Sequence, residues 1–191
     1  MKSPFKYLLA MAFLGGSAAA HAQSDWFVGG ALTSGKLKGD YEETFLGTTY
    51  KESISETDSG LQLRAGLHLN QGRVYGSLNH TSYDGLDLLS VTGSYDFVHN
   101  VNENVALYAG GTVGFGQFDF DDFDTENSYI LGVQLGAIFQ VTEQLSIDIG
   151  AFYQKVDAEY KESEVFMGQT LAAKATIDSL SGFRAGIDYS F

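Results

Sequence analysis

The sequence contains no cysteine, and its single proline is Pro4, near the N-terminus. No disulfide framework and no thiolate metal site can therefore form within the chain. Beyond residue 4 no residue lacks a backbone N–H donor, so proline interrupts no hydrogen-bonded ladder there. These absences favour a domain built from uninterrupted strands.

Long apolar runs are also missing. Gly, Ser, Asp or Gln interrupts each run before it reaches the roughly 18 residues that a membrane-spanning helix needs. Insertion into a membrane would therefore have to use strands. The 23 glycines and the 14% of aromatic residues are typical of a single domain rich in strands and turns.

Basic residues are few, because 11 Lys and Arg stand against 24 Asp and Glu, for a net charge of -13. Such a surface repels nucleic acid, which we therefore do not expect as a partner. The sequence has no His/Cys metal spacing, no phosphate-cradling glycine motif and no basic patch. We expect no cofactor.

The first 22 residues have the pattern of a cleavable signal peptide. Lys2 and Lys6 give a positive start, residues 7–14 are apolar, and Ala20-His21-Ala22 is a small-x-small cleavage site. The alternative, an uncleaved anchor, is disfavoured because the apolar run is far shorter than roughly 20 residues. We expect residues 1–22 to be removed and residues 23–191 to form one domain.

Period-two patterning predicts eight strands, an even number. They are expected at residues 26–37, 59–69, 73–83, 88–99, 105–118, 128–141, 145–160 and 177–191. Short connectors alternate with long ones, except for the tight turn at 84–87, and this alternation is typical of a transmembrane barrel. The sequence therefore predicts an all-β, eight-stranded, antiparallel up-and-down transmembrane barrel.

Alternation alone does not distinguish this barrel from a soluble one with an apolar interior. The composition of the polar face distinguishes the two kinds of barrel. This face is mostly Gly, Ser, Thr and Gln, whereas a water-facing surface would be dense in Lys and Glu. Small residues between a few large ones suit a crowded lumen. The apolar face is then expected to meet lipid, with aromatic residues gathered at both of its edges.

Isolated charges on the lumen face predict an internal ion-pair network, because a charge inside a filled eight-stranded barrel needs a partner. The residues are Arg64, Asp96, Asp148, Arg184 and Asp188. The alternative is that these charges lie near the barrel ends and are hydrated.

Three segments carry a resemblance to a known family: residues 25–30 (DWFVGG), 105–116 (VALYAGGTVGFG) and 183–191 (FRAGIDYSF). Together they resemble the small outer-membrane barrels that include the OmpA membrane domain and the OmpX/Ail group. The resemblance implies that residues 23–191 form a barrel in the outer membrane of a Gram-negative cell, in contact with its lipids and lipopolysaccharide. It also implies a C-terminal signal for the barrel assembly machinery, at Phe183, Ile187, Tyr189 and Phe191; ordinary edge packing is the alternative for Phe191.

Two further patterns suggest chemistry. His80 and Ser82 share one face of a strand near its loop end, similar to the His-x-Ser of the outer-membrane lipid A deacylase, but Ser90 and Thr92 stand where an acid is wanted. The loop with Asp119, Asp121, Asp122, Asp124 and Glu126 could bind divalent cations, although a solvated acidic loop is the simpler interpretation.

We therefore expect a structural or surface-interaction outer-membrane β-barrel with acidic extracellular loops and no catalytic residue. One alternative is a narrow, porin-like pore for small solutes, which the many lumen-side glycines favour and the arginine and carboxylate pairs oppose. A second alternative is an outer-membrane lipid-modifying hydrolase.

Overall fold

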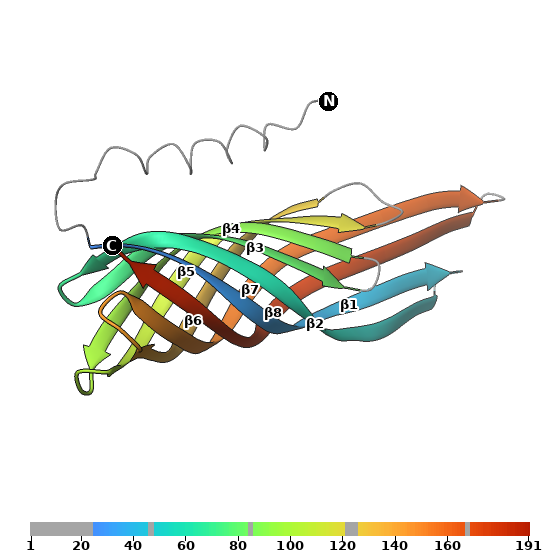
Figure 1. Cartoon of the computed structure of the whole chain (residues 1–191). Helices are drawn as coiled ribbons and strands as arrows, with labels where there is room; N and C mark the ends of the chain where they lie inside the picture. The colour runs from blue at the N-terminus through green and yellow to red at the C-terminus, as the bar shows by residue number, and fades with distance from the viewer. Residues whose placement is uncertain (1–24, 46–47, 84–85, 121–125, 167–168) are drawn as a thin grey trace, which may run out of the picture.

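A computed structural model describes residues 25–45, 48–83, 86–120, 126–166 and 169–191, which form eight antiparallel strands closed into one barrel (Figure 1). The strands are β1 (Trp26–Phe45), β2 (Thr48–Leu69), β3 (Gly72–Tyr83), β4 (Leu86–Asn100), β5 (Val105–Phe120), β6 (Glu126–Gln140), β7 (Leu145–Phe166) and β8 (Gln169–Ser190). Each strand pairs with its neighbours in sequence, and β1 closes the barrel against β8. The predicted all-β fold is confirmed.

The expected signal peptide, residues 1–22, lies outside the described residues. Among the residues that are described, no helix is long and apolar enough to cross a membrane.

The two ends of the barrel differ. At one end, which we call the short-turn end, β2–β3, β4–β5 and β6–β7 are joined by tight turns. At the other, the β1–β2 and β7–β8 hairpins continue well past the remaining strands (Figure 1). The pairing of β2 with β3 ends at Gly60, and the pairing of β7 with β6 ends at Val156. From these points toward the extended end, β1 and β8 stay paired with each other. Residues 36–45, 48–59, 157–166 and 169–178 therefore form a projecting four-stranded sheet, here called the extended sheet.

The extended sheet corrects the prediction of long loops at 38–58 and 161–176. Most of these residues are paired strand, with cross-strand partners as far as Phe45 and Thr48 in one hairpin and Phe166 and Gln169 in the other. The alternation of apolar and polar residues reveals a strand only where one face is buried. Where both faces meet water, polar residues occupy both, and the pattern disappears.

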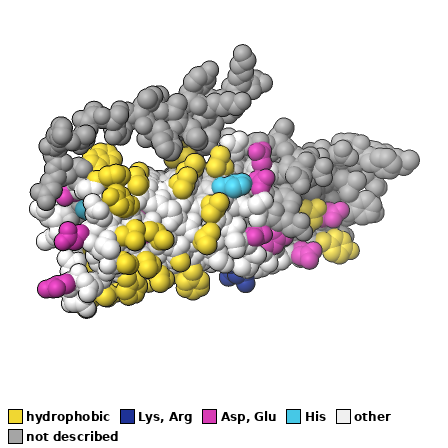
Figure 2. Space-filling view, viewed as in Figure 1, with side chains coloured by type: hydrophobic (Ala, Val, Ile, Leu, Met, Phe, Trp, Pro, Cys, Tyr) yellow, Lys and Arg dark blue, Asp and Glu magenta, His cyan; other side chains and the backbone are white. Residues whose placement is uncertain are grey.

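The barrel wall is apolar on the outside. Large hydrophobic side chains that would be buried in a soluble protein are exposed here, such as Leu131 at 64% and Phe183 at 70%. Figure 2 shows them gathered over the barrel wall, with acidic side chains toward its ends. Aromatic residues of this face lie near the short-turn end (Trp26, Phe97, Phe139, Tyr189 and Phe191) and near the extended end (Phe115, Tyr129 and Phe183). This outer surface is suited to hydrocarbon between two aromatic belts.

The interior is filled by three layers of side chains. Going up β4 from the short-turn end, the inward residues are Asp96, then the hydroxyls of Ser94, Thr92 and Ser90, then Leu88. Leu88 belongs to an apolar cluster at the extended end of the lumen, here called the apolar cap. Its buried members are Leu37, Leu88, Phe118, Ile130, Val156, Ile177 and Leu180, with Phe152 packed against them. The polar composition of the lumen face did not predict this layer.

The first prediction concerns the outer wall. Val133 points outward between the belt residues Tyr129 and Phe139 of the same strand, so Val133→Arg places a charge in the middle of the apolar band. We expect a loss of about 2–4 kcal/mol in the free energy of unfolding, measured by urea titration in lipid vesicles. Glu143→Arg, in the turn after β6, is the control and should change it by less than about 1 kcal/mol. Equal effects of the two substitutions would contradict a lipid-facing wall.

Candidate functional site

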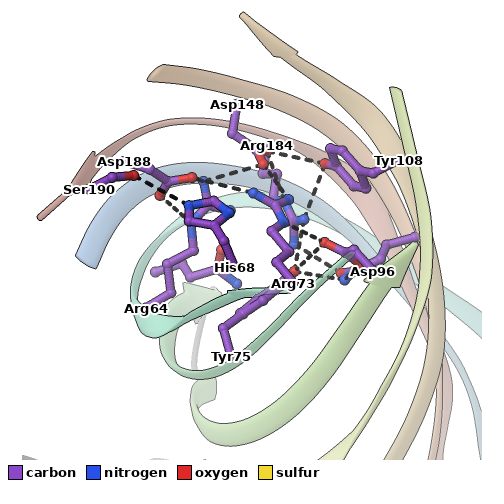
Figure 3. Close-up of polar contacts among 12 residues, drawn as sticks. Arg64, His68, Arg73, Tyr75, Asp96, Tyr108, Asp148, Arg184, Asp188 and Ser190 are labelled. Atoms are coloured by element: carbon purple, nitrogen blue, oxygen red, sulfur yellow. Dashed lines mark hydrogen bonds and ion pairs between the residues drawn. The ribbon is translucent and has the colours of Figure 1, made fainter. Parts of the chain in front are cut away.

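The main polar feature of the interior is a cluster of six charged side chains just above the short-turn end (Figure 3). They come from five strands: Arg64 on β2, Arg73 on β3, Asp96 on β4, Asp148 on β7, and Arg184 and Asp188 on β8. Each is at most 5% exposed. Three arginines face three aspartates, so the cluster, here called the charge network, is neutral as a whole.

Arg73 is the centre of the charge network because it reaches all three carboxylates. Its guanidinium lies 2.8 Å from Asp96, 2.6 Å from Asp148 and 3.4 Å from Asp188. Arg64 holds Asp188 from the other side with two parallel bonds of 2.7 and 2.9 Å. This paired geometry is the strongest form of arginine–carboxylate contact.

Asp148 is the carboxylate with the most cationic partners. Besides Arg73, it lies 3.4 Å from Arg64 and 3.4 Å from Arg184, and it accepts a hydrogen bond of 3.1 Å from the Tyr108 hydroxyl. A carboxylate in a dry interior needs this density of partners, because leaving it unpaired there costs several kcal/mol.

Three neutral side chains complete the charge network: Tyr75, Tyr108 and Gln134. Arg184 donates to the Gln134 amide oxygen at 2.9 Å and to both tyrosine hydroxyls at 3.1 Å. Gln134 in turn donates to Tyr75, at 2.7 Å, and to Asp96. Arg73 also lies over the Tyr108 ring, 4.6 Å from its centroid. Both N–H donors of the Gln134 amide are thus used, and its oxygen accepts from Arg184.

Glycines in the wall make room for the largest of these side chains. A Cβ at Gly136 or Gly150 would overlap the hydroxyl end of Tyr108. The two residues are directly opposite one another on β6 and β7. Glycine is therefore needed here because an aromatic ring occupies the space of a side chain, not because the backbone is strained.

The short-turn end of the lumen is covered below the charge network by Phe27 and His68. Phe27 is fully buried, and its ring centroid lies 4.8 Å from that of His68. His68 contacts the Ser190 hydroxyl at 3.3 Å. The charged layer is thus shielded from the solvent at that end of the barrel.

The structure brings together all five residues that the sequence singled out for the lumen, namely Arg64, Asp96, Asp148, Arg184 and Asp188. Sequence reasoning missed Arg73, which was placed at the start of a strand and not assigned a face. Its parity with Tyr75 and Ser77, both inward, was the available signal. The contributions of Tyr108 and Gln134 depend on the three-dimensional register and had no such signal.

The C-terminal residues lie on the lipid-facing side of β8. Phe183, Ile187 and Tyr189 alternate outward with exposures of 70%, 55% and 40%, and Phe191 follows at 63%. Tyr189 and Phe191 form an edge-on ring pair with centroids 5.2 Å apart. The four side chains form an accessible apolar row along β8 that ends at the short-turn end, and their role as an assembly signal stays a prediction.

His80 and Ser82 both point outward near the end of β3. The Ser82 hydroxyl donates to Asp87 at 2.6 Å, and Asp87 is its cross-strand partner on β4. His80 lies opposite Leu61 and Leu89. In a hydrolase the acid orients the histidine and the histidine activates the serine, whereas here the carboxylate holds the serine directly.

Of the acidic segment considered as a cation site, Asp119 is exposed, while the side chains of Asp121, Asp122, Asp124 and Glu126 lie outside the described residues. Within the part of the chain whose side chains are described, no group of His, Cys, Asp and Glu has the geometry of a metal site.

The second prediction tests the charge network. Asp148→Asn leaves three arginines against two carboxylates in a buried layer, so we expect a loss of about 3–5 kcal/mol in the free energy of unfolding in lipid vesicles. Asp178→Asn removes a charge of the same kind from an exposed position on β8 and should be close to neutral. A loss below about 1 kcal/mol for Asp148→Asn would contradict the assigned contacts.

The third prediction tests the packing around Tyr108. Gly150→Ala places a methyl group against the Tyr108 hydroxyl, which should reduce the free energy of unfolding by about 1–3 kcal/mol. In a Tyr108→Phe background the obstructing oxygen is gone, so the same substitution should have a clearly smaller effect. Additive effects in this double-mutant cycle would show that the two residues do not touch.

The sequence matches no protein-family model, and no curated protein matches it. Solved structures do match. OprG, an outer membrane protein of Pseudomonas aeruginosa, has a TM-score of 0.67 at 13% identity, over 88% of this chain and 97% of its own. Neisserial surface protein A (NspA) has a TM-score of 0.57 at 16% identity, over 88% of this chain and 98% of its own. OprH of P. aeruginosa has a TM-score of 0.55 at 22% identity, over 88% of this chain and 100% of its own. The chain therefore has the fold of the small eight-stranded outer-membrane barrels.

Proposed function

We propose that this chain is a structural or surface-interaction barrel of the Gram-negative outer membrane. The observation that carries the proposal is the combination of an apolar outer wall with a lumen filled by side chains at three levels. The outer wall suits the protein to lipid, and the filled lumen leaves the surface as the part that can meet other molecules. Similarity in fold to outer-membrane proteins supports the proposed location.

The extended sheet is the surface that this proposal assigns to contacts outside the cell. Its β1–β2 half exposes the acidic side chains of Glu43, Glu52 and Asp58, and Lys51 forms an ion pair with Glu42. The acidic residues expected on extracellular loops thus lie partly on paired strands. A hydrogen-bonded sheet holds its side chains in fixed positions, which lowers the entropic cost of binding compared with a loop.

The proposal includes three kinds of partner. Outer-membrane lipids and lipopolysaccharide surround the apolar wall, and the barrel assembly machinery recognises the row formed by Phe183, Ile187, Tyr189 and Phe191. Divalent cations would bridge the acidic segment at residues 119–126 to lipopolysaccharide phosphates. If a chelator of divalent cations does not weaken the binding of the protein to lipopolysaccharide, the proposed cation bridge is wrong.

No residue performs catalysis in this proposal. The hydrolase alternative makes a different prediction, because lipid A from cells expressing the protein would lose an acyl chain, and Ser82→Ala would restore it. Unmodified lipid A in both strains agrees with the proposal.

A narrow pore is the second candidate, and a small cavity inside the lumen favours it. A cavity of about 30 Å³ lies above the charge network, lined by residues that include Ser77, Thr92, Thr112 and Gln154. A conducting path would have to continue through the charge network on one side and the apolar cap on the other. Buried side chains occupy the lumen at both levels.

The fourth prediction addresses location and conduction together. The protein should fractionate with outer membranes, change its gel mobility on boiling, as a stable barrel does, and give no single-channel steps in a planar bilayer. Recovery in a soluble periplasmic fraction without detergent would overturn the proposed location. Stable conductance steps from the pure protein would establish the pore instead.

A further inference from the structure

The outer surface of the barrel carries three lysines that no acidic side chain neutralises. They are Lys36 and Lys38 on β1 and Lys155 on β7, and all three are exposed. None of them forms an ion pair with another described residue, whereas Lys51 pairs with Glu42 and the three arginines lie in the charge network. Unpaired cations are unexpected in a chain in which 24 acidic residues stand against 11 basic ones.

The pairing of the strands brings these three lysines together. Lys38 and Lys155 both lie directly opposite Ser179 of β8, one on each side of it. Residues directly opposite one another point to the same face of a sheet, so these two side chains start about 10 Å apart on one surface. Lys36 shares that face, because it is two residues from Lys38 on the same strand. Lysine side chains are long and flexible, so the three ammonium groups, here called the lysine patch, can converge on one anion.

Hydroxyl groups surround the lysine patch. On either side of Lys36 lie Thr57 and Ser181, and on either side of Lys38 lie Ser55 and Ser179. These four hydroxyl groups form no hydrogen bond with another residue in the described part of the chain. Free hydroxyl donors beside ammonium groups are the composition of a phosphate site.

The lysine patch lies at the edge of the apolar wall, toward the extended end. Tyr153, which is 53% exposed, precedes Lys155 by two residues and lies nearer the barrel wall. Phe183 of the aromatic belt, which is 70% exposed, lies two residues nearer the wall than Ser181. Lipid headgroups lie at the level of such a belt and just beyond it. The lysine patch is therefore placed beside headgroups and outside the hydrocarbon.

The acidic side chains nearest in sequence do not neutralise the lysine patch. Asp40 accepts a hydrogen bond of 2.9 Å from Ser53, and Asp178 is exposed. Among the described residues, neither carboxylate forms an ion pair with a lysine of the patch. Three like charges side by side repel one another, so an anion from outside the chain would stabilise them.

We propose that the lysine patch binds the phosphate groups of lipopolysaccharide in the outer leaflet of the membrane. This inference rests on the proposed outer-membrane location and adds a specific contact to it. The ammonium groups pair with phosphate oxygens, the surrounding hydroxyl groups donate to the same oxygens, and the acyl chains lie along the apolar wall beside Phe183. The contact is direct and needs no divalent cation, unlike the bridge proposed at residues 119–126.

Amine labelling of the protein in phosphatidylcholine vesicles tests the proposal at single residues. The vesicles contain lipid A that carries its phosphates or lipid A from which they have been removed, and mass spectrometry measures the labelling rate of each lysine. We expect phosphorylated lipid A to slow the labelling of Lys36, Lys38 and Lys155 at least about threefold, and dephosphorylated lipid A to leave it unchanged. Lys51, with 69% of its side chain exposed, is the internal control and should be labelled equally in both.

A triple variant and a matched single variant test the affinity for the lipid. Lys36→Gln, Lys38→Gln and Lys155→Gln together should lower the affinity for phosphorylated lipid A about tenfold or more, whereas Lys51→Gln should not change it. All four side chains are exposed, and the shift in gel mobility on boiling shows whether each variant is folded.

Equal labelling with the two forms of lipid A, or an unchanged affinity of the folded triple variant, would overturn the proposal. Equal protection by inorganic phosphate alone would also overturn it, because the patch would then bind a free anion and not the lipid. Membrane fractionation tests the outer-membrane location separately, so a protein that fractionates with outer membranes but fails these tests would contradict the lysine patch alone.

Discussion

The layer of the lumen next to the short-turn end depends on one electrostatic constraint: an ionised side chain inside a filled, eight-stranded barrel must be paired where it lies. Arg73 meets this constraint for three carboxylates at once, Asp96, Asp148 and Asp188. Those carboxylates are anchored on three different strands. The pairing therefore ties the register of each strand to the others, and a slip of one residue would move a charge to the lipid face.

The same constraint explains two of the glycines in the wall. The charge network needs long side chains, and long side chains need space that the opposite wall must leave open. Gly136 and Gly150 leave that space for Tyr108, which contacts both Asp148 and Arg184. The apolar cap at the other end of the lumen needs no such pairing and is held by packing alone.

Much of the fold could be predicted from the sequence because a strand with lipid on one side and a polar lumen on the other alternates in every second residue. β8 shows this best, from Phe183 to Phe191. The extended sheet could not be predicted in the same way, since both faces of residues 38–58 are polar and no alternation remains. Arg73 was missed at the edge of a turn, where parity is hardest to assign, and Gln134 entered the charge network only through the register of β6.

The central claim is that the charge network holds the barrel closed as one coupled unit, and the coupling free energy between Arg73 and Asp148 tests it most directly. A double-mutant cycle combines Arg73→Met with Asp148→Leu and measures the free energy of unfolding by urea titration in lipid vesicles. We expect the double variant to lose less stability than the sum of the two single losses, by a coupling free energy of at least about 1.5 kcal/mol. A coupling near zero would contradict the account, because the two groups would then be stabilised independently of each other.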